Sequence, residues 1–137
     1  MAAKDSARDA KRSALRVLVV DDEALIRWSV AQTLGDLGME IVQADTGRAT
    51  LEAIASAEFP FDVVVVDLRL PDVADLSLLV ELRRTHAATA LIVMTAFGTA
   101  DVVAQARAIG VAAVMAKPFD VHDLARVVMT SAGVGPA

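Results

Sequence analysis

The chain has 137 residues and no cysteine, and its formal net charge at pH 7 is −5. This length fits one domain with a hydrophobic core, and the lack of cysteine excludes disulfides, a thiol nucleophile and thiolate metal ligands. The hydrophobic content of 55% does not indicate a membrane protein, because the longest stretch without charge, residues 87–100, is too short to span a bilayer. No signal-like segment opens the chain, so a cytoplasmic location is expected.

The charges are unevenly distributed along the chain. Residues 1–16 carry five basic side chains against two acidic ones, so the remainder is more acidic than the chain as a whole. Affinity for nucleic-acid phosphates comes from Lys and Arg, and this distribution therefore predicts no direct nucleic-acid binding. From composition and periodicity we expect a flexible basic extension at 1–14, one domain at 15–131 and a flexible tail at 132–137.

In chain order, short apolar runs alternate with segments of helical periodicity. The runs that predict buried strands are 16–20, 39–44, 62–67, 90–94 and 112–116. The segments that predict helices are 24–37, 48–57, 75–85, 100–109 and 120–130. Five strands alternating with five helices predict right-handed βαβ units and hence an α/β fold, a three-layer α/β/α sandwich around a parallel sheet.

Individual side chains carry further expectations about the helices. In the first helix the residues expected to face the core are Ile26, Val30, Thr33, Leu34 and Leu37. Trp28 lies between these positions and should point sideways or outward. Asp45 or Thr46 is expected to cap the second helix, Asp120 to cap the last one, and Gly110 to end the helix at 100–109.

Polar side chains follow four of the five predicted strands. Asp21 and Asp22 follow the first, Asp67 ends the third, Thr95 follows the fourth and Lys117 follows the fifth. Nothing comparable follows the second strand, which is consistent with a place at the edge of the sheet. Because parallel strands end on one side of a sheet, these residues should converge although they are far apart in the sequence.

The convergent groups have the chemistry of a phosphoryl-transfer site. Three clustered carboxylates repel one another unless a cation lies among them, and Mg²⁺ suits a site with few carboxylates and an open coordination sphere. Lys117 adds a point charge and Thr95 a hydroxyl donor, which with the metal would clamp a transferring phosphoryl group. Asp67 is then the candidate nucleophile and would form an aspartyl phosphate.

Four motifs resemble those of the receiver domain of two-component response regulators. They are Val-Leu-Val-Val-Asp-Asp-Glu at 17–23, Val-Val-Asp-Leu-Arg-Leu-Pro at 65–71, Met-Thr-Ala at 94–96 and Lys-Pro-Phe at 117–119. Each is weakly specific alone, but all four in order at strand ends make a specific signal. The resemblance covers about residues 16–130, is most similar to receivers of the NtrC type, and implies the CheY-like, flavodoxin-like strand order 2-1-3-4-5.

The resemblance also implies a role for the matching polar residues. Asp67 would be the phosphoacceptor and Lys117 would contact the phosphoryl group. Mg²⁺ would be bound by Asp22, Asp67 and the backbone carbonyl of Arg69, and Asp21 would act through bound water. Thr95 would be the switch hydroxyl, and the positions expected to modulate the switch or its lifetime are Ala96, Phe97, Val114 and Arg69.

The sequence departs from the receiver pattern at two places. Val114 stands where many receivers carry a rotating Tyr or Phe, so an aromatic toggle is absent and the signal would pass through Thr95 and the loop that follows it. Ala74-Asp75 replaces the Asp-Gly pair usual after the proline loop, and Asp tolerates a left-handed conformation less well than Gly. We therefore expect that loop to be reshaped.

The leading hypothesis is a phosphorylation-dependent switch rather than an enzyme with a separate substrate. A histidine kinase or a small phosphodonor would modify Asp67, and the face formed by 100–109, 112–116 and the last helix would control an output domain or partner, or form a homodimer. One alternative is a receiver-like interaction module with little phosphotransfer, which Val114 favours. The other is a Mg²⁺-dependent phosphohydrolase, but Arg69 stands where such enzymes carry a second acid.

Overall fold

The computed structural model describes residues 14–73, 75–96 and 98–133. Most of the expected extension at 1–14 and tail at 132–137 lies outside the described residues, and so do Ala74 and Phe97. The boundaries assigned from the sequence therefore stay predictions. None of the described helices has both the length and the apolar character needed to cross a lipid bilayer.

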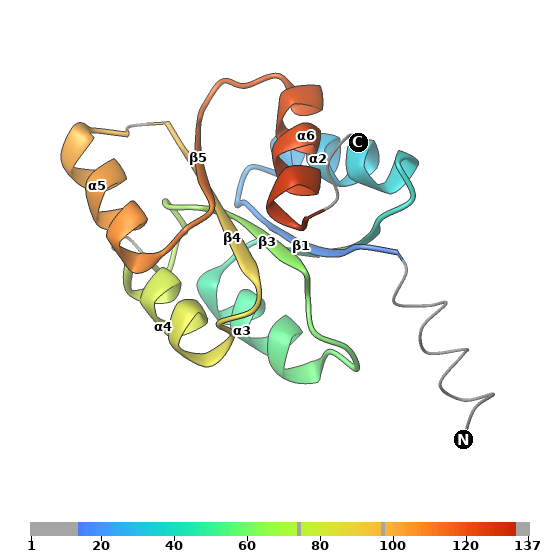
Figure 1. Ribbon diagram of the computed structural model, residues 1–137, viewed down its shortest axis with the longest axis horizontal. Coiled ribbons are helices and arrows are strands. Elements are labelled where there is room, and N and C mark those ends of the chain that lie inside the picture. Colours follow the sequence, from blue (N-terminus) through green and yellow to red (C-terminus); the bar gives the residue numbers. More distant parts are fainter. Residues whose placement is uncertain (1–13, 74, 97, 134–137) are drawn as a thin grey trace.

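The described chain forms a parallel sheet of five strands and the helices that connect them (Figure 1). The strands are β1 (Arg16–Val20), β2 (Glu40–Ala44), β3 (Val63–Asp67), β4 (Ala90–Thr95) and β5 (Ala113–Ala116). The helices are α2 (Ala24–Asp36), α3 (Gly47–Ser56), α4 (Ser77–Thr85), α5 (Ala100–Ile109) and α6 (Val121–Ser131). The strand order is β2-β1-β3-β4-β5, and every pairing is parallel. The predicted fold class and strand order are confirmed.

Helices cover both faces of the sheet and make it the middle of three layers. In Figure 1, α2 and α6 lie on one face, and α3, α4 and α5 lie on the other. Side chains alternate between the two cores, so that Val17 and Val19 pack with α2 and α6 while Leu18 and Val20 pack on the opposite side. Because both faces are covered, the central strands β1 and β3 are buried at every position, as their unbroken apolar runs predict.

Capping residues fix several helix ends where the sequence predicts them. Thr46 Oγ1 accepts a hydrogen bond from the backbone N–H of Ala49, and Gly110 ends α5 in the left-handed conformation with a φ of 102°. Helix α4 begins two residues later than expected. Asp75 Oδ1 accepts hydrogen bonds from the backbone N–H and the hydroxyl of Ser77, so Asp75 caps the helix from outside and is not its first residue.

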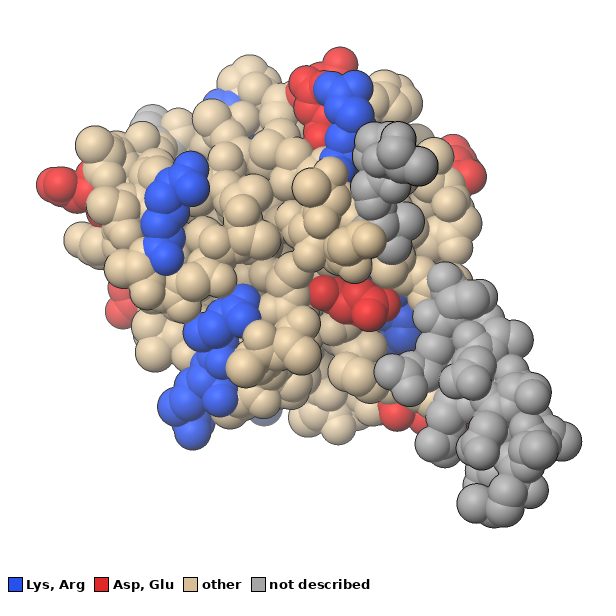
Figure 2. Space-filling view, viewed as in Figure 1, with Lys and Arg blue, Asp and Glu red and all other residues tan. Residues whose placement is uncertain are grey.

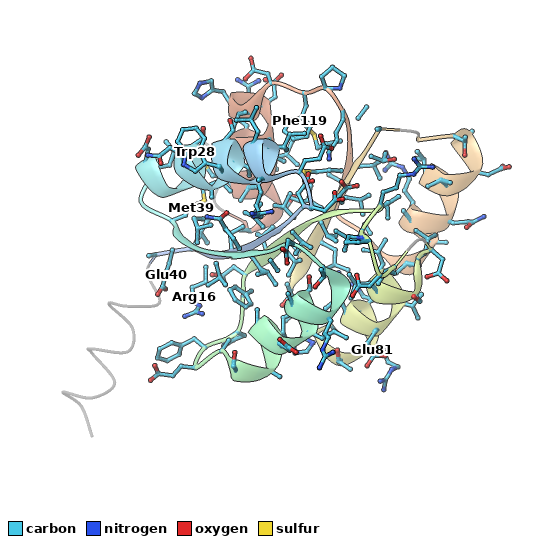
Figure 3. The ribbon with its side chains drawn as sticks, turned by 180° about the vertical axis from the view of Figure 1, so that it is seen from behind. Arg16, Trp28, Met39, Glu40, Glu81 and Phe119 are labelled. Carbon is cyan, nitrogen blue, oxygen red and sulfur yellow. The ribbon has the colours of Figure 1, made fainter. Side chains whose placement is uncertain are left out.

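The core-facing side of α2 differs from the expectation at one position. Val30 and Leu34 are fully buried, but Leu37 is 55% exposed, and its assignment to the core was wrong. The helix ends at Asp36, and Leu37 lies in the turn that leads through Gly38 to β2, so helical periodicity no longer directs its side chain. Trp28 is 58% exposed and points away from the sheet, as expected (Figure 3).

Candidate functional site

Asp67 is the last residue of β3, and the structure fixes its carboxylate at the end of the sheet. The residue is only 5% exposed. Its Oδ1 accepts a hydrogen bond of 2.9 Å from the backbone N–H of Arg69, while the N–H of Leu68 donates to the carbonyl of Met94 at 3.1 Å. The chain just after Asp67 is therefore tied both to the neighbouring strand and to the carboxylate itself.

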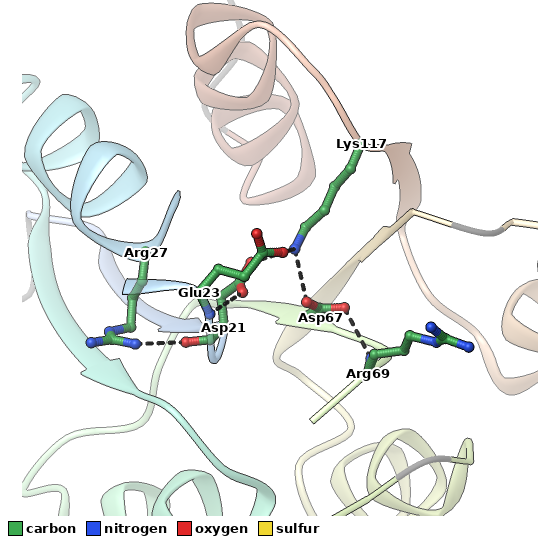
Figure 4. Close-up of polar contacts among 6 residues, drawn as sticks. All are labelled: Asp21, Glu23, Arg27, Asp67, Arg69 and Lys117. Atoms are coloured by element: carbon green, nitrogen blue, oxygen red, sulfur yellow. Dashed lines mark hydrogen bonds and ion pairs between the residues drawn. The ribbon is translucent and has the colours of Figure 1, made fainter. Parts of the chain in front are cut away.

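Lys117 extends its ammonium group from the end of β5 into a cluster of carboxylates (Figure 4). Its Nζ lies 2.7 Å from Asp21 Oδ2, 2.8 Å from Asp67 Oδ2 and 3.1 Å from Glu23 Oε1. The side chain of Lys117 is 7% exposed, and its backbone N–H donates to the carbonyl of Thr95 at 2.8 Å. Residues that are distant in sequence thus meet at the carboxyl ends of β1, β3 and β5.

The loop after β1 is held in place by several hydrogen bonds around Asp21. The backbone N–H of Asp21 donates to the carbonyl of Ala44 at 3.1 Å, and Asp21 Oδ1 accepts from the N–H of Glu23 at 2.8 Å. The guanidinium of Arg27 donates to the carbonyl of Asp21 at 2.8 Å (Figure 4). Asp21 has no exposed surface, whereas Asp22 and Glu23 are exposed.

The electrostatics of the cluster follow from burial and from its excess of acids. Burial raises the pKa of the Asp21 carboxyl, and the hydrogen bonds from Lys117 and the Glu23 backbone oppose that effect. Burial alone would lower the pKa of the Lys117 ammonium, but its hydrogen bonds to Asp21, Asp67 and Glu23 outweigh burial and raise it. Lys117 therefore stays charged, and the surrounding carboxylates still exceed it in charge.

The acidic cluster also has the donor set of a divalent-cation site. Carboxylate oxygens of Asp21, Asp22 and Asp67 all lie within 4.8 Å of one another. Mg²⁺ binds oxygen at about 2.1 Å, which places ligands on opposite sides of the ion about 4.2 Å apart. The three carboxylates therefore fit around one such ion after small movements. An ion there would offset the charge that Lys117 leaves uncompensated.

The other residues singled out from the sequence lie around this cluster at different distances from it. Thr95 is 5% exposed at the end of β4, and with Arg69 and Gln105 it lines an adjoining pocket of about 390 Å³. Ala96 is exposed in the loop that follows, and Phe97 lies outside the described residues. Val114 pairs with Val93 in the sheet and packs against the core on the side of α3, α4 and α5.

Two contacts at the site were not predicted from the sequence. In the sequence Glu23 stood out only as the last residue of the motif at 17–23, yet it is the third carboxylate on Lys117. Its side chain makes no helix-capping hydrogen bond, which leaves it free to turn toward the ammonium. Arg27, which holds the carbonyl of Asp21, gave no signal beyond its place one helical turn after the acidic run.

The geometry agrees with the result of comparison with known families. A sequence model of the response regulator receiver domain matches residues 17–129. The chain therefore belongs to the family of receiver domains of two-component response regulators. Receiver domains of this family interact with histidine kinases and output domains and bind Mg²⁺ at an acidic cluster, and the aspartates of the cluster described above form one.

Individual relatives show how much of a response regulator the chain represents. It is 35% identical over 107 residues to the DNA-binding transcriptional regulator NtrC of Escherichia coli K12. The aligned residues make up 78% of this chain and 22% of that protein. It is 37% identical over 110 residues to the transcriptional regulatory protein PdtaR of Mycobacterium tuberculosis H37Rv, covering 80% of this chain and 52% of PdtaR. The chain thus spans between a fifth and about half of these relatives.

Solved structures show the same architecture. The crystal structure of a CheY-like response regulator receiver domain protein from Methanospirillum hungatei JF-1 superimposes with a TM-score of 0.82 at 27% identity, over 88% of this chain and 94% of that one. The receiver domain of a LuxO-type repressor protein from Vibrio parahaemolyticus has a TM-score of 0.80 at 24% identity, over 88% of this chain and 91% of that one. The second likeness bears on the fold alone.

Proposed function

We propose that Asp67 accepts a phosphoryl group from the phosphohistidine of a histidine kinase or from a small phosphodonor, with Mg²⁺ bound beside it. The observation that carries this proposal is the ammonium of Lys117, which contacts Asp67 Oδ2 at 2.8 Å and Asp21 Oδ2 at 2.7 Å. Because the Lys117 ammonium already contacts the nucleophile, it can bind the negatively charged phosphoryl oxygens when the phosphoryl group is transferred.

The transfer step uses the two oxygens of Asp67 differently. Oδ1 is held by the N–H of Arg69 at 2.9 Å, so Oδ2 is the oxygen that leaves Lys117 and attacks phosphorus. The bond from phosphorus to the imidazole nitrogen of the donor breaks, and its electron pair stays on the imidazole. Lys117 then pairs with a phosphoryl oxygen in place of the carboxylate, so the ammonium keeps an anionic partner while the site gains about one negative charge.

We assign the metal ligands to Asp22, Asp67 and the carbonyl of Arg69, with Asp21 acting through a water molecule. When bound, Mg²⁺ would neutralise charge that develops on the phosphoryl oxygens. The exposure of Asp22 supports this arrangement, because an exposed carboxylate can turn to a hydrated ion without opening the core. Asp21 is fully buried and both of its oxygens accept hydrogen bonds, which suits an indirect role.

The signal would leave the site through Thr95. A Cβ atom at Gly98 would lie 2.9 Å from Thr95 Cγ2, so the loop after β4 packs directly on the methyl group of Thr95. A rotation that turns the Thr95 hydroxyl toward the phosphoryl group would displace this loop and shift the face of α5, β5 and α6. Because Val114 offers no aromatic ring, this route carries the switch alone, and the face would contact an output domain, a partner or a second copy.

We further propose that the histidine kinase docks on the exposed side of α2. Leu25 and Trp28 are 76% and 58% exposed, and Leu25 borders a hollow of about 210 Å³ whose other walls include Lys117 and Phe119. The apolar surface thus adjoins the residue that contacts the phosphoacceptor. A kinase helix seated there would bring its phosphohistidine next to Asp67.

The direct test is incubation with acetyl phosphate and MgCl₂ followed by mass spectrometry. The expected result is one added phosphoryl group that hydroxylamine removes, that requires Mg²⁺ and that is absent from Asp67→Asn. Asp36→Asn, which makes the same change at an exposed position of α2, should be modified like the wild type. An unmodified wild-type chain that also shows no Mg²⁺-dependent change in Trp28 fluorescence would contradict the proposal and favour an interaction module without phosphotransfer.

A comparison of two phosphodonors tests the docking surface. Trp28→Ala should slow transfer from a phosphorylated histidine kinase domain by at least several-fold but leave modification by acetyl phosphate unchanged. Leu51→Ala, at another exposed apolar residue on α3, serves as the matched control and should affect neither donor. Equal rates for Trp28→Ala and the wild type with the kinase would exclude α2 as the docking surface.

The cytoplasmic location and the absence of nucleic-acid binding stay predictions.

A further inference from the structure

The segment after Asp67 forms a closed turn rather than an open loop. Leu70 and Val73 exchange two backbone hydrogen bonds of 3.2 Å each and form an isolated antiparallel bridge, with Pro71 and Asp72 at the tip. Leu70 is 6% exposed and belongs to the core between the sheet and α3, α4 and α5. The bridged turn thus directly follows Arg69, whose N–H donates to the Asp67 carboxylate.

Asp72 ties the tip of this turn to the first residues of α3. Its Oδ1 accepts a hydrogen bond of 2.7 Å from the backbone N–H of Gly47, and its Oδ2 accepts one of 2.9 Å from that of Arg48. These donors belong to the N-terminus of the helix, where N–H groups lack helical partners and negative charge is favoured. The two hydrogen bonds lower the pKa of the Asp72 carboxyl, so it is ionised at neutral pH.

Gly47 allows the turn to approach the helix this closely. A Cβ atom at this position would lie 2.4 Å from Val73 Cγ2 and 3.3 Å from Asp72 Oδ1. The first distance is too short for any real contact, and Val is stiff about its first side-chain torsion. A side chain at position 47 would therefore push the turn away from α3. The hydrogen bonds of Asp72 thus join the turn to α3, and the absence of a side chain at Gly47 allows the close approach at the same junction.

This junction joins the start of α3 to the chain that leads from β3 toward α4. The same chain carries Arg69, whose N–H donates to the Asp67 carboxylate and whose carbonyl is the assigned metal ligand. The turn is thus attached at one end to the site and at its tip to a helix that contributes no residue to the site.

We propose that Asp72 is a positioning residue for the phosphoacceptor site: it docks the 70–73 turn onto α3 and so fixes the Arg69 peptide beside Asp67. This inference rests on the proposed function, because it assigns to the turn the placement of a metal ligand. The proposal has a specific consequence: loosening the junction should weaken Mg²⁺ binding. Phosphoryl transfer measured at saturating Mg²⁺ should be slowed less. A helix cap with only a structural role would alter stability and leave the Mg²⁺ dependence unchanged.

The first experiment removes the carboxylate and measures Mg²⁺ binding by Trp28 fluorescence and by the Mg²⁺ dependence of acetyl phosphate labelling. Asp72→Ala should raise the half-saturating Mg²⁺ concentration about tenfold, with labelling close to that of the wild type at saturating Mg²⁺. Asp72→Asn, which keeps one acceptor, should recover part of the affinity. Thr46→Ala removes another cap of α3, whose Oγ1 bonds to the N–H of Ala49, and should leave Mg²⁺ binding unchanged.

The second experiment loosens the junction without changing any charge. Gly47→Ala should also weaken Mg²⁺ binding, because the new methyl group displaces Val73. Gly35→Ala is the matched control, since a Cβ there meets nothing within 4 Å, and it should bind Mg²⁺ like the wild type. If Asp72→Ala proves unfolded by circular dichroism, this pair still decides the question.

The outcomes separate the inference from the function on which it rests. If the wild-type chain shows neither a Mg²⁺ response nor phosphorylation, both the inference and the proposed function are overturned. A responsive wild type with unchanged Mg²⁺ affinity in folded Asp72→Ala or Gly47→Ala overturns the positioning role alone. Weakened affinity in Thr46→Ala to the same extent would also overturn it, because the effect would then belong to α3 stability in general.

Discussion

Two buried cations lie at opposite ends of the sheet and differ in what surrounds them. At the carboxyl end, Lys117 contacts the carboxylates of Asp21, Asp67 and Glu23. At the amino end, Arg16 forms one ion pair of 3.5 Å with Glu40, and its guanidinium lies 5.1 and 5.8 Å from the ring centres of Phe61 and Phe59 (Figure 3). The Arg16 side chain is 10% exposed and that of Lys117 is 7% exposed, so burial does not distinguish them.

The difference lies in the balance of charge and in the packing. Arg16 is covered by aromatic faces, and no acceptor faces its Nε among the described residues. Such a contact stabilises the chain locally and offers nothing to an ion. Around Lys117 the acids outnumber the cation, and one of them, Asp21, is fully buried. A buried cation is therefore weak evidence for a functional site, whereas an excess of carboxylates around it is strong evidence.

The strongest test of this contrast removes Lys117. Lys117→Met should lower the free energy of unfolding by about 3 kcal/mol without Mg²⁺, because two buried carboxylates then face each other without a cation. Addition of MgCl₂ should restore more stability to the variant than it adds to the wild type. Denaturant titration with and without MgCl₂ measures both effects. Equal stability of the variant and the wild type in the absence of Mg²⁺ would show that the ion pairs contribute little.

The pH dependence of the same variant gives the next largest effect. The pKa of Lys117 is raised in the folded state, so its contribution is fully present below the unfolded pKa of 10.5 and is lost as the pH rises toward the folded value. The stability difference between wild type and Lys117→Met should be constant from pH 8 to about 10 and shrink by about 1 kcal/mol near pH 11.5. Denaturant titrations across this range measure it. A constant difference up to pH 11.5 would mean that Lys117 acts through packing and not through charge.

At the other end of the sheet, Arg16→Met should cost about 1 kcal/mol, since it removes the aromatic contacts and one half-exposed ion pair but keeps an apolar stem. The backbone N–H of Arg16 would still donate to Asp62 Oδ2 at 2.8 Å. Mg²⁺ affinity and acetyl phosphate labelling should not change, which makes this variant the counterpart of Lys117→Met. A change in Mg²⁺ affinity would mean that the two ends of the sheet are coupled.

The contrast also explains what could be predicted from the sequence. Strand runs such as 62–67 and the acids and lysine that follow them predicted the sheet, and parallel topology then predicted that Asp21, Asp67 and Lys117 would meet. Strand ends are fixed by the sheet and need no knowledge of loop shape. Leu37 was misplaced because helical periodicity stops at Asp36, where a turn begins.

Loop contacts were beyond the reach of the sequence. Asp72 bonds to residues about two dozen positions earlier, and the docking of the turn on Gly47 depends on two loops folding together. Glu23 reaches Lys117 only because the chain after β1 turns at Asp21. Neither contact has a periodic or compositional signature. The residues that bear the chemistry were thus predictable, while those that orient them depend on tertiary structure.

Glu23 provides the smallest and most discriminating prediction. Its side chain is 59% exposed, so Glu23→Gln should lower the free energy of unfolding by only about 0.5 kcal/mol, as expected for a largely solvated ion pair. Glu52→Gln, which removes the partner of Arg48 at 67% exposure on α3, should have a similarly small effect on stability.

The two variants should differ in their Mg²⁺ dependence. Loss of Glu23 removes one of the acids that surround Lys117 and should weaken Mg²⁺ binding about twofold, since the cluster becomes less negative, whereas Glu52→Gln should bind Mg²⁺ like the wild type. Stronger Mg²⁺ binding in Glu23→Gln would instead mean that Glu23 obstructs the ion. The number of acids around Lys117 would then overstate how strongly this end of the sheet attracts Mg²⁺.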